Sequence, residues 1–200
     1  MKLLTITGYK GGVGKSTTAI HLAAYFSLNA PTLLVDGDPN RTSKAWAARG
    51  DVQLPFAVAD ERQAMKMISA REWVIIDTPA RPHSDDLTEL AKGCDLLILP
   101  TCPDVLSLEP MLETVKDLGD ASYRALLTIV PPKPSKEGEI LRGDLIKEGI
   151  PVFKTMIRRS AGFPKAALEG VTIAEVKDKR MASVWSDYQA LGDEIIELLG

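Results

Sequence analysis

Apolar and polar positions follow one another along this chain in two kinds of block: short continuous apolar runs, and longer segments in which apolar residues recur at helical spacing. The apolar runs are rich in β-branched residues and bounded by turn-forming residues, which predicts buried strands. They lie at Leu3 to Thr7, Thr32 to Val35, Trp73 to Ile76, Leu96 to Leu99 and Leu126 to Val130. The helical segments between them include Lys15 to Leu28, Asp60 to Ala70, Asp85 to Lys92 and Leu106 to Leu118.

The last quarter of the chain adds a short apolar run at Pro151 to Phe153, which could form one more strand, and a closing helix at Met181 to Leu199. Strands that are apolar on both sides and alternate with helices predict a parallel sheet covered on both faces. We therefore expect an α/β fold: residues 1–200 as a single domain with a mostly parallel twisted sheet and helices on both of its faces. The proline-rich stretch at 131–135 is short and is expected to be a loop.

Composition fits this globular class, with 45% hydrophobic residues, 26% charged residues and a mean hydropathy near zero. No apolar stretch reaches the length of a membrane span and the first residues run into a strand pattern, so we expect a cytoplasmic protein. Cys94 and Cys102 match neither a disulfide framework nor a metal motif. His21 and His83 have no second ligand at metal spacing, which argues against a histidine metal site.

Charge is distributed unevenly along the chain. The window from residue 142 to residue 180 holds nine basic and five acidic residues, so its net charge is +4, against -7 for the remainder. Basic windows of this size are common on solvated surfaces, and charge alone leaves nucleic-acid binding and an ordinary surface as equal alternatives.

A glycine-rich loop follows the first strand: residues 8–18 read Gly-Tyr-Lys-Gly-Gly-Val-Gly-Lys-Ser-Thr-Thr, and a helical pattern begins at once. Glycines let successive N–H groups point at phosphate oxygens, and the helix N-terminus adds its positive dipole end. Lys15 would reach the β- and γ-phosphates and Ser16 would bind Mg²⁺, although Tyr9 stands at the first glycine of the general pattern. The predicted phosphate-binding residues are Gly11, Gly12, Val13, Gly14, Lys15, Ser16 and Thr17.

Carboxylates follow two further strands. The second predicted strand leads into Asp36-Gly37-Asp38, and the third into Asp77. Open α/β sheets bind ligands at the carboxyl ends of their strands, and phosphoryl transfer depends on positioning and charge neutralisation. An aspartate after a strand is also common as a turn or helix cap, and this alternative stays open for Asp36.

The segment Lys10-Gly-Gly-Val-Gly-Lys-Ser16 resembles the deviant Walker A motif of the ParA/MinD family of P-loop ATPases, whose mark is the extra lysine, here Lys10. The resemblance implies ATP/ADP and Mg²⁺ as cofactors and an ATP-bound homodimer in which Lys10 touches the partner's nucleotide. It also implies that Asp38 orients or deprotonates the attacking water. The implied catalytic residues are Lys10, Lys15 and Asp38, and the implied metal ligands are Ser16, Asp36 and Asp77.

The resemblance continues beyond these motifs. Residues 80–84 resemble the loop that senses the γ-phosphate, and residues 96–108 resemble the strand that leads into an interface helix. Residues 126–131 lack the asparagine or arginine with which relatives contact the adenine base, so the sequence assigns no base contact.

Within the family the chain resembles the short ParA-type partition ATPases, and its last sixteen residues carry four acidic and no basic residues, unlike a membrane-surface helix. The resemblance implies nonspecific DNA binding, a nucleoid-associated location, a ParB-like stimulating partner and no membrane. The alternative function is an ATP-dependent metabolic or metal-centre assembly enzyme on the same scaffold. The expected DNA contacts are Arg158, Arg159, Lys165, Lys177, Lys179 and Arg180.

Overall fold

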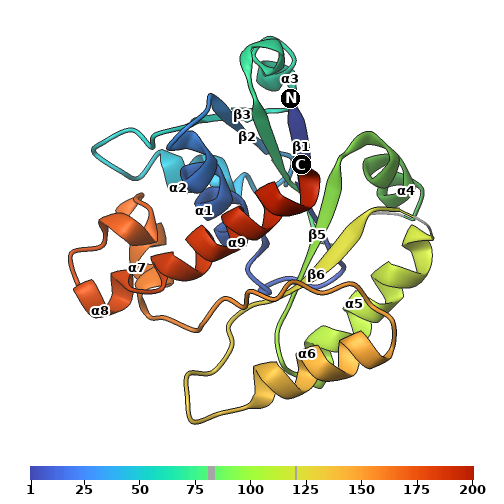
Figure 1. The fold of residues 1–200 in the computed structure, drawn as a ribbon. Helices are drawn as coiled ribbons and strands as arrows, with labels where there is room; N and C mark the ends of the chain where they lie inside the picture. Colours follow the sequence, from blue (N-terminus) through green and yellow to red (C-terminus); the bar gives the residue numbers. More distant parts are fainter. Residues whose placement is uncertain (81–83, 120) are drawn as a thin grey trace.

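A computed structural model describes residues 1–80, 84–119 and 121–200 of the chain. Six parallel strands form one sheet in the order β3-β2-β4-β1-β5-β6 (Figure 1). The expected parallel α/β sheet is therefore confirmed. The strands are β1 (Lys2–Ile6), β2 (Thr32–Asp36), β3 (Ala57–Asp60), β4 (Trp73–Asp77), β5 (Leu96–Thr101) and β6 (Tyr123–Leu127).

Helices connect the strands and cover both faces of the sheet (Figure 1). The described α-helices are α1 (Lys15–Ser27), α2 (Thr42–Ala47), α3 (Glu61–Ala64), α4 (Ser84–Gly93), α5 (Val105–Leu118), α6 (Glu137–Lys147), α7 (Gly162–Glu169), α8 (Lys179–Ala182) and α9 (Trp185–Leu199). Two 3₁₀ turns complete the structure, η1 (Ile68–Ala70) and η2 (Ile173–Glu175).

Each strand contributes side chains to two separate cores, because successive residues of a strand point to opposite faces. In β5, Leu96 and Ile98 join the core that contains residues of α1 and α9, whereas Leu97 and Leu99 join the core that contains residues of α4, α5 and α6. This double burial explains why the strands appear in the sequence as continuous apolar runs.

The largest difference from the sequence prediction lies between residues 57 and 70. The predicted helix from Asp60 to Ala70 is wrong as one element, because Asp60 ends the edge strand β3 and caps α3. The Asp60 carboxylate accepts a hydrogen bond from the N–H of Gln63, and the Gln63 side chain bonds back to the N–H of Asp60. This capping box starts a helix of a single turn, and η1 follows separately.

The predicted strand from Leu126 to Val130 is displaced: β6 runs from Tyr123 to Leu127. It ends because Ile129 adopts a φ of 53°, a left-handed conformation that a β-branched residue rarely takes and that interrupts extended structure. The chain then returns beside β6, where Val152 and Arg158 form isolated parallel bridges with Ala125 and Val130. The expected strand at Pro151 to Phe153 is thus reduced to the single bridge at Val152, and the expected closing helix is split into α8 and α9.

Helices α1 and α9 pack closely through a glycine. A Cβ added at Gly192 would lie 2.2 Å from the Tyr25 ring, far inside van der Waals contact. The ring has little freedom to yield, because the Tyr25 hydroxyl donates a hydrogen bond to the neighbouring Asp193 carboxylate. Only glycine at position 192 permits this approach of the two helices.

A buried histidine links α1 to the C-terminal elements. The Nε2 atom of His21 accepts a hydrogen bond of 2.9 Å from the N–H of Ile173, so the proton of the neutral ring is on Nδ1, which donates to the Thr17 carbonyl at 2.7 Å. The ring stacks on Tyr188 and contacts the edge of Trp46. Burial lowers the pKa of His21 to about 4, although the hydrogen bond to the Thr17 carbonyl acts in the other direction.

This histidine predicts an acid-sensitive fold. The folded-state pKa of His21 is about 4, below the unfolded value of about 6.5. The stability that depends on a neutral His21 is therefore fully present above about pH 6.5 and is lost as the pH falls toward 4. Roughly 3 kcal/mol of unfolding free energy should disappear over that window. We expect urea denaturation of the His83→Gln protein, which keeps His21 as its single histidine, to show a steeper loss of stability between pH 7 and 5 than the same protein carrying His21→Gln. Equal slopes would contradict this role.

Candidate active site

The glycine loop and α1 present uncapped N–H groups at the carboxyl edge of the sheet. Gly14 is the N-cap of α1 with a φ of 86°, Gly12 has a φ of 78°, and no side chain caps the helix. The first turn of α1 carries no acidic residue. Its N–H groups are therefore available to an anion, which the helix dipole favours at this end.

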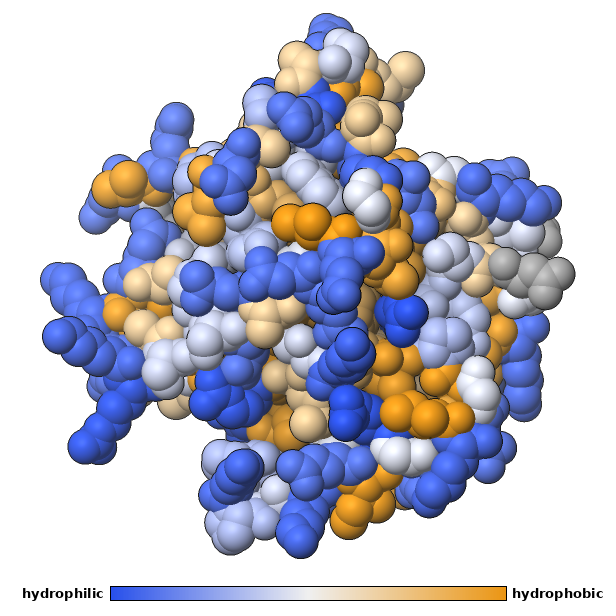
Figure 2. Space-filling model, viewed as in Figure 1, coloured by the Kyte–Doolittle hydropathy of each residue, from blue (hydrophilic) through white to orange (hydrophobic). Residues whose placement is uncertain are grey.

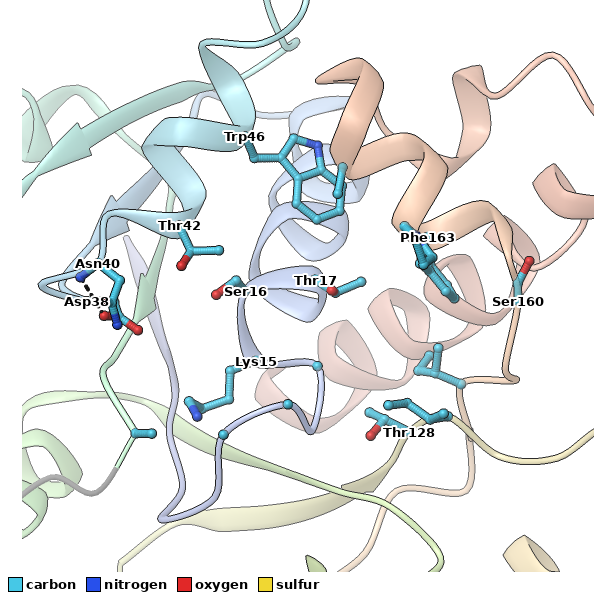
Figure 3. A pocket seen from close by; sticks show the side chains of 18 of the residues that line it. Lys15, Ser16, Thr17, Asp38, Asn40, Thr42, Trp46, Thr128, Ser160 and Phe163 are labelled. Atoms are coloured by element: carbon cyan, nitrogen blue, oxygen red, sulfur yellow. Dashed lines mark hydrogen bonds between the residues drawn. The ribbon is translucent and has the colours of Figure 1, made fainter.

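A cavity of about 820 Å³ opens in front of this helix end. Figure 3 shows Lys15, Ser16 and Thr17 on its floor, Asp38, Asn40 and Thr42 along one side, and Thr128, Ser160 and Phe163 along the other. The end at Lys15 and Asp38 is polar, and elsewhere the lining combines the aromatic side chains of Trp46, Phe163 and Tyr188 with polar ones. This shape fits a ligand with a charged part and a flat apolar part.

Lys15 and Ser16 lie where the sequence predicted. The Lys15 ammonium is buried and donates a hydrogen bond of 2.8 Å to the Lys10 carbonyl. Burial lowers the pKa of Lys15, while the charges of Asp77 and Asp38 act in the opposite direction. Asp38 lines the cavity with Lys15, whereas Asp77 is not part of the cavity lining.

Asp77 is the buried acid of the site. Its Oδ2 atom accepts a hydrogen bond of 2.7 Å from the Ser43 hydroxyl, and its buried Oδ1 atom has no hydrogen-bond partner among the described residues. Burial raises the pKa of Asp77 to about 6; the hydrogen bond from Ser43 and the nearby Ser16 hydroxyl lower it, the charge of Asp36 raises it and that of Lys15 lowers it. An unpaired carboxylate oxygen beside the Ser16 hydroxyl fits Mg²⁺, which binds few protein oxygens and keeps substrate phosphates and waters as its other ligands. The described residues contain no cluster of three or more His, Cys, Asp or Glu side chains.

Asp36 has the capping role that the sequence left open. Its buried carboxylate accepts hydrogen bonds from the N–H groups of Asp38 at 3.2 Å and of Lys44 at 2.8 Å, which fixes the turn after β2 and the start of α2. Asp36 does not line the cavity within the described part of the chain. Its role at Mg²⁺ stays a prediction.

Asp38 lines the polar end of the cavity (Figure 3), where its Oδ1 atom accepts a hydrogen bond of 2.8 Å from the Asn40 N–H. The carboxylate still has a second oxygen for a ligand. Its position is compatible with the predicted action on an attacking water.

Of the other predicted loop residues, some line the cavity and others lie outside its lining. Gly11, Gly12, Gly14 and Thr17 line the cavity, whereas Val13 is buried behind it. The Lys10 side chain lies outside the cavity lining and points to α5, where its ammonium donates to the Ser107 hydroxyl at 3.0 Å.

Several residues of the site escape sequence reasoning. The Thr128 hydroxyl donates to the Val13 carbonyl at 2.8 Å and so holds the back of the glycine loop, yet Thr128 belonged to a predicted strand. Ser43 and Trp46 come from α2, a short helix with no strong periodicity. Residues 81–83 of the predicted γ-phosphate loop, and with them His83, lie outside the described residues.

Comparison with known proteins agrees with this site. The family model of the CobQ/CobB/MinD/ParA nucleotide binding domain matches residues 4–173, which is most of the chain. The chain belongs to the ParA/MinD family of ATPases. It is therefore a nucleotide-binding enzyme that hydrolyses ATP, as predicted from the glycine loop.

Individual members of the family are similar over nearly the whole chain. Maintenance of carboxysome distribution protein A from Gloeobacter kilaueensis is 35% identical over 202 residues, which covers 97% of this chain and 94% of that protein. The chromosome-partitioning ATPase Soj from Treponema pallidum is 27% identical over 248 residues, with coverages of 98% and 97%. The structure of apo McdA from Cyanothece has the same fold, with a TM-score of 0.72 at 17% identity, over 96% of this chain and 99% of that one.

As a ParA/MinD ATPase, the protein should lose nucleotide affinity when its buried lysine is removed. We expect Lys15→Ala to weaken ATP binding at least about a hundredfold, because charge-assisted bonds to phosphate are lost. Isothermal titration calorimetry measures the effect, with Lys147→Ala on the exposed face of α6 as the charge-matched control. Undiminished affinity in the Lys15→Ala protein would overturn the assignment of the phosphate loop.

Proposed function

We propose that this ATPase forms an ATP-dependent dimer that distributes an intracellular cargo over nonspecific DNA, with a ParB-like partner that stimulates hydrolysis. The observation that carries the proposal is the cavity in which Lys15, Ser16 and Asp38 meet beside the buried Asp77. Support for the positioning role comes from similarity along nearly the full chain to a carboxysome distribution protein and to a chromosome-partitioning ATPase.

In this proposal each residue of the cavity has a separate part in hydrolysis. The N–H groups at the start of α1 and the Lys15 ammonium bind the β- and γ-phosphates. Asp77 and Ser16 would hold Mg²⁺, with Asp36 supporting its shell, and a bound ion would supply neutralisation of the charge on the phosphates. Asp38 orients the attacking water, so it contributes mainly in the transition state.

Dimerisation is proposed to complete the site, because Lys10 lies beside the cavity and does not line it. Lys10 contacts the first turn of α5, where Val105 and Leu106 are 67% and 73% exposed. Two large apolar side chains exposed next to a cation suit contact with a second copy of the chain, whose bound ATP supplies the complementary negative charge. Hydrolysis by the monomer should therefore be slow.

Asp38 provides a direct test of the hydrolytic mechanism. We expect Asp38→Asn, which keeps the turn to Asn40 but removes the charge, to slow single-turnover hydrolysis about a hundredfold or more. ATP affinity should change by less than about threefold, since the carboxylate acts mostly in the transition state. Rapid-quench measurement at saturating ATP tests this, and the variant should accumulate as an ATP-bound dimer. A rate equal to that of the unmodified protein would make Asp38 only a turn residue.

The DNA surface proposed here differs from the expected one at Arg158. Its guanidinium bonds to both oxygens of Asp187 at 2.7 to 3.0 Å, and to Ser186, so most of its charge is already neutralised. Lys165 lies 4.0 Å from Glu169. Of the six expected contacts, the exposed ones without an ion pair among the described residues are Arg159, Lys177, Lys179 and Arg180.

These four residues belong to one part of the molecule. The Ser160 hydroxyl donates to the Met181 carbonyl at 3.4 Å, which places Arg159 beside α8 and its Lys179 and Arg180. Figure 2 shows hydrophilic side chains projecting from the side of the molecule where Figure 1 places α7 and α8. Arg159 also lines the nucleotide cavity. A bound nucleotide can therefore act directly on a residue of the proposed DNA surface.

The names of the relatives support a protein body or a DNA molecule as the cargo. Binding to nonspecific DNA would place the protein on the nucleoid. No helix in the described ranges has the length and apolar character to cross a membrane. The alternative of a metabolic or metal-centre assembly enzyme predicts a small-molecule substrate whose addition accelerates ATP hydrolysis. Stimulation by DNA together with a small basic partner protein supports the positioning role instead.

The DNA surface is tested by reversing its charge. We expect Arg159→Glu, Lys179→Glu and Arg180→Glu together to weaken ATP-dependent binding to random duplexes at least about tenfold, and to reduce its salt dependence, because fewer counterions are released. Fluorescence anisotropy with ATP and with ADP is the measurement. The control carries Lys66→Glu, Lys92→Glu and Lys136→Glu, the same change of charge elsewhere on the surface. Equal binding by the two triple variants would contradict the proposed surface.

A further inference from the structure

Helix α5 holds the front of the phosphate loop at both of its ends. Near its C-terminal end the Tyr9 hydroxyl donates to the Asp117 carboxylate. At its N-terminal end the Lys10 ammonium donates to the Ser107 hydroxyl at 3.0 Å and lies 3.7 Å from Asp104. At a rise of about 1.5 Å per residue these ends are roughly 20 Å apart along the helix.

The two attachments differ in strength. Tyr9 packs against the core that contains residues of α5, and the hydrogen bond to Asp117, burial and the charges of Asp117 and Glu113 raise the pKa of Tyr9 to about 12. Tyr9 is therefore held by the packing of its ring as well as by its hydrogen bond. Lys10 and Asp104 are 33% and 50% exposed, and an exposed ion pair is easily exchanged for another. One attachment is an anchor and the other can be released.

We propose that Asp104 is a positioning residue that keeps Lys10 on its own subunit, so that Lys10 must leave Asp104 before it can reach the nucleotide of a second copy. This inference rests on the proposed ATP-dependent dimer. A bound triphosphate carries more negative charge than one carboxylate, so the exchange runs toward the dimer once ATP is present. Asp104 then sets how much ATP-bound protein is needed before dimers form.

The local hydrogen bonds support this function. Asp104 is the N-cap of α5: its Oδ1 atom accepts from the Ser107 N–H at 2.9 Å, and its Oδ2 atom accepts from the Ser107 hydroxyl at 2.8 Å. The Ser107 hydroxyl thus receives a hydrogen bond from Lys10 and gives one to Asp104. The position of Lys10 is in this way tied to the end of the helix whose exposed apolar residues are proposed to meet the second copy.

The capping geometry also allows a variant that changes the charge of residue 104 without disturbing the start of α5. Asparagine caps helices about as well as aspartate, so Asp104→Asn keeps the start of α5 and removes only the charge that attracts Lys10. A control with the same change of charge is Asp144→Asn, which breaks the exposed pair of Asp144 with Lys147 on α6.

The first experiment measures dimer formation by analytical ultracentrifugation at saturating ATP. We expect Asp104→Asn to lower the dimer dissociation constant about two- to fivefold, the range set by exposed ion pairs, while Asp144→Asn leaves it unchanged. In a Lys10→Ala background the Asp104→Asn change should have no further effect, because the pair is already broken. An unchanged or weaker dimer in the Asp104→Asn protein would overturn the proposal.

The second experiment does not depend on dimerisation. In the nucleotide-free protein, Lys10 should react faster with an amine-labelling reagent in the Asp104→Asn variant than in the unmodified chain, because the ion pair that helps to hold the Lys10 ammonium against α5 is removed. Peptide mass spectrometry follows Lys10, with Lys147 as an internal reference. Equal labelling rates would show that Asp104 does not restrain Lys10. If ATP produces no dimer of the unmodified protein, the proposed function is wrong. The labelling rates would still show whether Asp104 restrains Lys10.

Discussion

A buried carboxylate with one unpaired oxygen is the constraint on which the rest of the site depends. Asp77 ends a central strand of the sheet, away from solvent, and transfer of a charge into such a place is unfavourable unless a partner is supplied. The Ser43 hydroxyl satisfies one oxygen, and Ser16 and Lys15 favour the charged form. The cost of burying the Asp77 charge is therefore only partly offset within the folded chain. Binding of a cation and a nucleotide should offset more of it and so stabilise the fold.

The supports of the phosphate loop divide it into fixed and movable parts. At the back, the Thr128 hydroxyl holds the carbonyl of Val13, and His21 holds that of Thr17. At the front, Tyr9 is fixed to α5 by its hydrogen bond to Asp117. The ion pair of Lys10 with Asp104 is also at the front, and its two side chains are 33% and 50% exposed to solvent. Rigid supports keep the cavity formed before any ligand arrives.

The fold and the centre of the site were predictable because their signals are local. Strands buried on both faces appear as continuous apolar runs, and the glycine loop has its chemistry within residues 8–18. Elements whose existence depends on distant partners were missed or misplaced. The end of β6 is set by the left-handed Ile129, and the role of Arg158 is set by Asp187, which lies in α9. Neither periodicity nor composition reports such pairings.

The glycine between α1 and α9 has a consequence for the breadth of the nucleotide cavity. Gly192 lies one helical turn beyond Tyr188, whose side chain forms part of the cavity wall and whose hydroxyl is 3.3 Å from that of Thr18. A methyl group at position 192 would push α9 away from α1, and the Tyr188 side chain would move away from the cavity with α9. This one position, outside the glycine loop, therefore limits how wide the cavity is beside Tyr188.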